Sequence, residues 1–198
     1  MCCRTKNLRS VNGTAEVKHE ASLKDFQKPV YRMAWRSEME PEMGYRNMLA
    51  VEELASQGKL TVTHKGARSF DFAQYALLSR MAWLTADWPL DKAAKEKRML
   101  PRTYASGWLK IAIDWGMTLP QSMDELVAIG NEPRNPKREQ LAYNRIGKIA
   151  RKLEEAGLIK CLRRGDIQRK NNAVWLLTIG TPEENREVEA YVRNHMYL

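Results

Sequence analysis

The sequence has few of the residues that build disulfide frameworks and metal sites. Its 198 residues include three cysteines, at positions 2, 3 and 161, and three histidines, at positions 19, 64 and 195. Two cysteines are adjacent and no Cys-x-x-Cys pair occurs, so neither a disulfide framework nor a zinc site is predicted. The histidines have no second ligand at helical spacing. We therefore expect no metal, no other cofactor and a reducing, cytoplasmic environment.

Long hydrophobic runs are also missing. No apolar stretch approaches the roughly 20 residues that a membrane-spanning helix requires, so we expect no membrane segment. The first residues, Met1 to Arg4, are not followed by an apolar region of the kind that secretory signals contain. The composition is otherwise ordinary for a globular protein, with 43% hydrophobic and 29% charged residues. Wholesale disorder is therefore excluded.

Recognisable catalytic patterns are absent as well. The sequence contains no P-loop, no HExxH, no GxSxG and no Ser/His/Asp set. Its paired acids, such as Glu52-Glu53 and Glu154-Glu155, are neighbours that diverge on a helix instead of converging on one substrate. We therefore expect no catalytic residues and a protein that is not an enzyme.

What the chain does have is positive charge, and that charge is concentrated. Lys and Arg number 33 against 24 Asp and Glu, for a net charge of +9. Residues 134–172 alone hold 12 Lys and Arg against 4 Asp and Glu, a balance of +8. Such an excess predicts an acidic partner, either nucleic acid or an anionic surface.

The first hundred residues divide into two regions. Residues 1–40 show little periodicity and are interpreted as a partly ordered arm. Residues 41–100 form a helical N-terminal region, with a helix expected over 43–57, a short strand over 60–63 and a second helix over 70–86. A short charged helix is expected over 91–99.

Two features of this region have alternative interpretations. The 70–86 helix carries Phe72, Tyr75, Trp83 and Leu84, which indicate either a buried helix or an interface with a protein partner or a second copy. The helix, Gly58 and strand together are interpreted either as a degenerate second winged helix or as an ordinary helix–glycine–strand junction.

Residues 101–180 follow a different pattern. Helices are expected over 103–115 and 122–130, then a breaker-rich loop over 131–140 and a helix over 141–156. A strand over 158–162, a polar hairpin over 163–172 and a return strand over 174–179 follow. A last helix is expected over 181–198, with Thr181 and Pro182 at its start.

The 141–156 helix is amphipathic. At 100° per residue, the apolar residues fall within one half of the helix: Leu141, Ala142, Ile146, Ile149, Ala150 and Leu153. The opposite half carries Tyr143, Asn144, Gly147, Lys148 and Arg151. Asn reads adenine, Arg and Lys read guanine or bind phosphate, and Gly allows close approach to a groove. Tyr143 is interpreted either as a DNA contact or as an aromatic at the rim.

The stretch from Leu141 to Ile159, ending in Leu-Glu-Glu-Ala-Gly-Leu-Ile, resembles the recognition helix and first wing strand of the winged helix-turn-helix superfamily. MarR-like regulators and phage or plasmid replication initiators share this pattern. The resemblance covers about residues 101–180. It implies a mainly α fold with a small β-wing, a winged helix-turn-helix domain joined to a helical N-terminal region.

The resemblance also implies a function. A double-stranded-DNA-binding protein of regulatory or replication-associated type is expected, cytoplasmic and dimeric, with helix 141–156 in the major groove and the basic wing on flanking backbone. The expected DNA-binding residues are Tyr143, Asn144, Arg145, Gly147, Lys148, Arg151, Lys152, Arg163, Arg164, Arg169 and Lys170. The alternative is an inhibitor or adaptor from a mobile element, which uses a winged-helix scaffold to block a host complex through protein contacts.

Overall fold

The computed structural model describes residues 44–120, 135–166, 168 and 171–196. Several expected features therefore lie outside the described residues: the arm over 1–40, the helix over 122–130, and the two wing residues Arg169 and Lys170. The described part of the chain belongs to one compact unit, which begins at Glu40.

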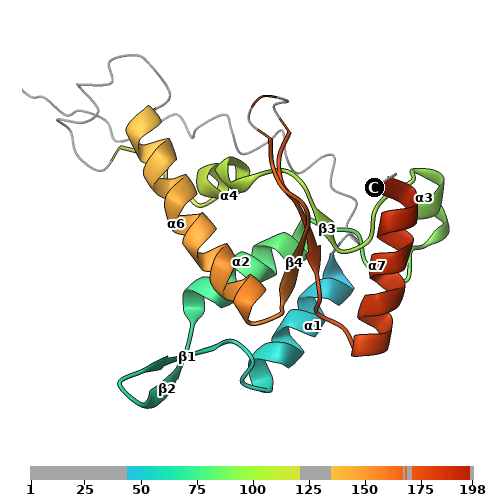
Figure 1. The fold of residues 1–198 in the computed structure, drawn as a ribbon, viewed down its shortest axis with the longest axis horizontal. Coiled ribbons are helices and arrows are strands. Elements are labelled where there is room, and N and C mark those ends of the chain that lie inside the picture. The colour runs from blue at the N-terminus through green and yellow to red at the C-terminus, as the bar shows by residue number, and fades with distance from the viewer. Residues whose placement is uncertain (1–43, 121–134, 167, 169–170, 197–198) are drawn as a thin grey trace, which may run out of the picture. The chain divides into compact units, whose positions relative to one another are not determined.

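Helices dominate this unit, and its strands are short. The helices are α1 (Tyr45–Ser56), α2 (Phe72–Trp83), α3 (Lys92–Glu96), α4 (Trp108–Asp114), α6 (Pro136–Glu155) and α7 (Pro182–Met196). The strands are β1 (Thr61–His64), β2 (Ala67–Phe70), β3 (Thr103–Tyr104), β4 (Ile159–Arg163) and β5 (Val174–Leu177). They form two antiparallel sheets, β1-β2 and β3-β5-β4 (Figure 1). The expectation of a mainly α fold with a small amount of β structure is confirmed.

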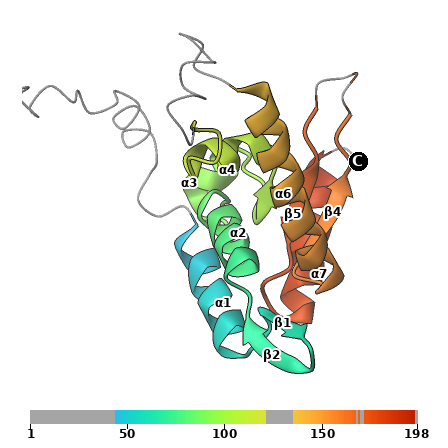
Figure 2. The same ribbon diagram turned by 90° about the vertical axis from the view of Figure 1, so that its left-hand side faces the viewer.

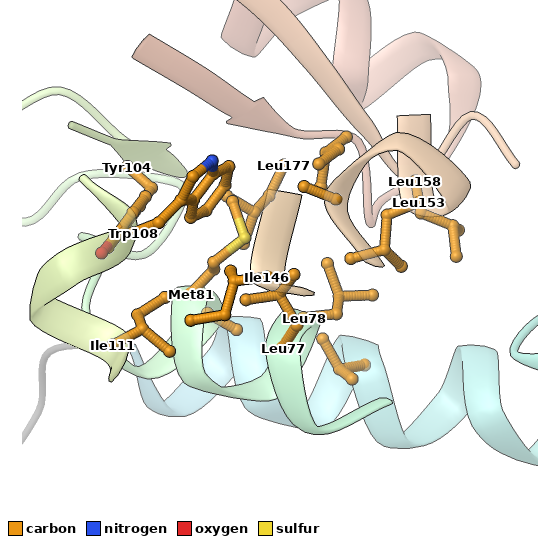
Figure 3. Close-up of a cluster of buried hydrophobic side chains, with 14 of the residues drawn as sticks. Leu77, Leu78, Met81, Tyr104, Trp108, Ile111, Ile146, Leu153, Leu158 and Leu177 are labelled. Atoms are coloured by element: carbon orange, nitrogen blue, oxygen red, sulfur yellow. The ribbon is translucent and has the colours of Figure 1, made fainter. Parts of the chain in front are cut away.

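One hydrophobic core joins the two halves of the described chain. Leu77, Leu78 and Met81 on α2 meet Ile146 and side chains of α4, α6 and β5 in this core, and all three are fully buried (Figure 3). The regions expected over 41–100 and 101–180 therefore share their core. Burial of this apolar surface is the main contribution that holds α6 in place.

The start of α6 differs from expectation. The helix begins at Pro136, five residues before the expected position 141. The Asn135 side chain accepts hydrogen bonds from the backbone N–H groups of Lys137 and Arg138, at 3.1 and 3.4 Å. Asn at the N-cap and Pro at the first helical position are both favourable helix starts. Interpreting this Asn-Pro pair as part of a loop was wrong.

The helix expected over 103–115 is also corrected. Thr103 and Tyr104 form strand β3, paired with Leu176 and Trp175 of β5, and α4 begins only at Trp108. The N-cap is Gly107, whose φ of 78° favours glycine. A three-to-four-residue spacing of apolar residues here reflects a strand followed by a helix that both face the core. The spacing therefore did not distinguish them from one continuous helix.

The C-terminal helix uses its apolar face inside the protein. Val188 and Val192 are fully buried against Leu176, with Trp88 packed beside them. Tyr191 packs on the Trp88 ring at a centroid distance of 5.5 Å. The valines of this helix are therefore covered within the protein and are not available to a second copy.

Candidate nucleic-acid interface

Helix α6 lies on the core along one side only. Ala142, Ile146, Ala150 and Leu153 are its buried residues, and they recur at steps of three or four. This side packs against α2, α4 and β4. The periodicity of the helix then places the opposite side in solvent over all 20 residues.

The expected contact residues of α6 lie on or beside that solvent side. Tyr143, Asn144, Arg145, Lys148, Arg151 and Lys152 are exposed, and Gly147 is half-buried. Asn144, Lys148 and Arg151 follow one another at steps of four and three, so they form a single row along the helix. Tyr143 and Arg145 lie on the two flanks of this row. The structure therefore brings Asn144, Lys148 and Arg151 together as a polar, basic row.

One residue expected in the core belongs to this row instead. Leu141 is 68% exposed, so placing it in the buried half of α6 was wrong. Its position is three residues before Asn144, at the same spacing as the rest of the row. The core side of the helix is narrower than half its circumference, because only Ala142, Ile146, Ala150 and Leu153 are buried. An apolar side chain therefore lies among polar ones on the exposed face.

Two further residues extend the row because α6 begins earlier than expected. Lys137 and Gln140 are exposed in the first turns of the helix. The Gln140 side-chain amide donates a hydrogen bond to Asn144 Oδ1 at 3.0 Å, which orients the Asn144 amide. The sequence signal that could have found them is Asn135-Pro136, a cap followed by a first-turn proline.

Lys152 is tied to the start of α2. Its ammonium lies 3.5 Å from Asp71 Oδ2, and Asp71 caps α2 by accepting from the N–H groups of Ala73 and Gln74. Burial by itself would raise the pKa of Asp71, but hydrogen bonds from Gln74 and the charge of Lys152 together hold this pKa below its usual value. Asp71 thus stays ionised at neutral pH, and Lys152 is partly neutralised at this end of the face.

The wing is the hairpin formed by β4 and β5. Its register shifts between Cys161 and Arg163, and the two strands are joined again at the bridge between Asp166 and Asn171. Arg163 and Arg164 are exposed near the outer end of the hairpin. They lie where the strands leave the core, so both guanidinium groups are accessible to a partner.

The wing runs back alongside α6. Strand β4 follows the end of α6 after Gly157, whose φ of 71° lets the chain reverse direction. Figures 1 and 2 both show β4 and β5 running toward the end of the protein where α6 begins. The exposed row of α6 is therefore accompanied by a basic hairpin near its N-terminal end.

The described residues contain little else that indicates a chemical site. No group of three or more His, Cys, Asp or Glu among them could hold a metal ion. Burial, followed by the nearby charge of Glu154, raises the pKa of the Cys161 thiol, which makes this side chain a weaker nucleophile at neutral pH. Within the same residues no helix is long and apolar enough to cross a bilayer.

Comparisons of this chain with protein-family models, with curated proteins and with solved structures find no match.

Proposed function

We propose that this protein binds double-stranded DNA without catalysing a reaction, in a regulatory or replication-associated role, through the exposed row of α6. The observation that carries the proposal is the two-sided character of this helix. Its buried side is fixed in the core, and its outer side presents Asn144, Lys148 and Arg151 in one row. A rigid helix with such a row fits the major groove of B-DNA, which is about 12 Å wide.

The order of elements supports a winged helix-turn-helix scaffold for this role. Helix α2 is followed by the short helix α3 and then by β3, α4, α6 and the β4–β5 hairpin, and the sheet order β3-β5-β4 places the returning strand in the centre. On this interpretation the domain begins with α2, earlier than the boundary at residue 101 expected from the sequence. Helix α6 is then the recognition helix and the hairpin is the wing.

The chemistry of the row suits a mixture of base and backbone contacts. The Asn144 amide matches the donor and acceptor that adenine presents in the major groove. Lys148 and Arg151 match guanine or phosphate oxygens, and Leu141 matches the methyl group of thymine. Arg163 and Arg164 on the wing match flanking phosphates, which position the protein but do not read sequence.

Selection of bound duplexes from genomic fragments, followed by binding measurements on two variants, tests this proposal. Asn144→Ala and Lys148→Ala should each weaken binding to a selected duplex by about 1–3 kcal/mol, because each removes a base contact. Asn144→Ala should leave binding to a random duplex nearly unchanged. Asn194→Ala, on the exposed side of α7, is the matched control and should change neither. Full affinity of both α6 variants for the selected duplex would exclude this docking.

A second candidate function, a protein-binding adaptor or inhibitor from a mobile element, is favoured by the outer side of α2. Phe72 is 75% exposed and Trp83 is 39% exposed, and they lie eleven residues apart on one side of the helix. Phe70 packs on Phe72 with their ring centroids 4.9 Å apart, so the aromatic surface extends beyond the helix. Exposed aromatics of this kind often mark protein contacts.

The same surface provides the prediction on assembly. We expect a homodimer in which α2 packs against α2 of a second copy, because the apolar residues of α7 are already buried. Phe72→Ser should weaken self-association by about tenfold or more, since central aromatic contacts contribute strongly to interfaces. Tyr45→Ser on α1 is the control, an aromatic that is 59% exposed and belongs to a different helix. Light scattering that finds a monomer at high micromolar concentration would contradict the dimer and favour the adaptor function.

A further inference from the structure

The hairpin of β1 and β2 is a second basic element that the proposed function does not use. Residues 58–70 contain Lys59, Lys65 and Arg68 as well as His64, and no Asp or Glu. Strands β1 and β2 pair in register from Thr61 opposite Phe70 to His64 opposite Ala67. Among the described residues, no carboxylate lies within salt-bridge distance of these three cations.

Core packing does not account for the outer part of this hairpin. All of β2 is exposed, and so are the last two residues of β1. An isolated two-stranded hairpin is only marginally stable in water, so its shape depends on its attachment. That attachment is at the base, where Leu60 is fully buried and its carbonyl accepts a hydrogen bond from the Asp71 N–H at 3.0 Å.

The turn places a lysine in an unfavourable backbone conformation. Lys65 and Gly66 connect the strands with φ values of 50° and 83°. Two-residue turns with two positive φ values favour Asn or Asp followed by Gly, because residues with larger side chains are strained there. A lysine at the first position therefore has no local structural advantage, whereas it does place a cation at the tip of the hairpin.

The hairpin lies at the opposite end of α6 from the wing. Asp71 directly follows β2, and its contact with Lys152 connects the base of the hairpin to the last turn of α6. Figure 1 shows β1 and β2 near the C-terminal end of α6, and Figure 2 shows the same placement from the side. A 20-residue helix is about 30 Å long, close to one turn of B-DNA at about 34 Å.

From this placement we propose that the β1–β2 hairpin is a second contact for the phosphate backbone of duplex DNA, at the end of α6 that the wing does not reach. Lys65 and Arg68 bind phosphate oxygens, and the strands hold them at a fixed distance from α6. Arg68 is already oriented, because its guanidinium donates to Thr61 Oγ1 at 3.0 Å and to the Gly58 carbonyl at 3.2 Å. This inference rests on the proposed DNA binding by α6.

The test compares salt-dependent binding of a random duplex by three forms of the full chain. Lys65→Asn with Arg68→Gln removes two charges, and Asn suits the positive φ at the turn. Lys92→Gln with Lys95→Gln removes two charges from α3, which Figure 1 shows well away from α6. The hairpin variant should bind on the order of tenfold more weakly at about 0.1 M salt, with a log–log salt slope smaller by about 1.8. The α3 variant should match the wild type.

The outcomes separate this inference from the function it rests on. Equal affinity and equal slope for the hairpin and α3 variants, with a wild type that binds, would overturn the hairpin contact alone. A wild type that does not bind duplex DNA would overturn both proposals. Arg68→Lys keeps the positive charge but loses the hydrogen bonds that the guanidinium group donates. Because the proposed contact with phosphate depends on charge, this variant should retain most of the affinity for duplex DNA. If it loses as much as the double variant while its thermal unfolding is unchanged, a charge contact is contradicted.

Discussion

Ile146→Ala should lower the free energy of unfolding by about 2–5 kcal/mol, because it leaves a cavity where α6 meets α2 and α4. Ile146 is fully buried in the same core cluster as Met81 and Leu78 (Figure 3). Native interiors are closely packed, so the surrounding side chains fill such a space only in part. Equilibrium denaturation with urea, monitored by circular dichroism, measures the difference.

Ile113→Ala is the matched control for this substitution. It removes the same atoms from a helix of the same protein, but Ile113 is 47% exposed. The loss there should be below about 1 kcal/mol, since less apolar surface leaves contact with the protein. Similar losses for the two variants would mean that α6 is not held on the core through Ile146, and the exposed row would lose its fixed orientation.

Arg102→Met should also be strongly destabilising, by about 2–4 kcal/mol, because it breaks a buried polar network. Arg102 Nε donates to Asn47 Oδ1 at 3.1 Å, and the guanidinium forms an ion pair with Glu184 at 2.9 Å. Asn47 is fully buried, and its amide nitrogen donates to Thr85 and to the Ala86 carbonyl. Without Arg102, the Asn47 oxygen and the Glu184 carboxylate each lose a partner.

Arg186→Met distinguishes this buried network from a surface ion pair. Arg186 pairs with Glu183 one turn away on α7, and both side chains are mostly exposed. Such pairs contribute about 0–1 kcal/mol, so the variant should unfold nearly as the wild type does. Comparable losses for the two arginine variants would show that the Arg102 network does not connect α1, β3 and α7 energetically.

The parts of the fold that could be predicted were those determined by local periodicity. The core positions of α6, the helix α1 and the strands β1, β4 and β5 all follow from apolar spacing and glycine stops. Strand β3 could not be recognised because two residues pair with β5 some seventy positions later in the chain. Strand β2 was missed because its four residues are exposed and show no alternation of burial.

The candidate site also has features that local periodicity predicts and features that depend on contacts between distant parts of the chain. The outward direction of Asn144, Lys148 and Arg151 follows from the period of one helix, so the sequence alone predicted it. The exposure of Leu141 could have been predicted in the same way, because Leu141 lies three residues before Asn144 on the same helix. The position of the β1–β2 hairpin at the end of α6 depends on the contact between Asp71 and Lys152, which are far apart in the sequence.

Lysine footprinting on a duplex tests the central claim most directly, because it finds the contact surface without altering the protein. Free and DNA-bound protein are acetylated briefly at low salt, and the extent of reaction at each lysine is measured by mass spectrometry. We predict that DNA reduces acetylation of Lys137 and Lys148 on α6 severalfold, while Lys92 and Lys95 on α3 react equally in both states. Full reactivity of Lys137 and Lys148 in the complex, or protection confined to α3, would contradict binding through α6.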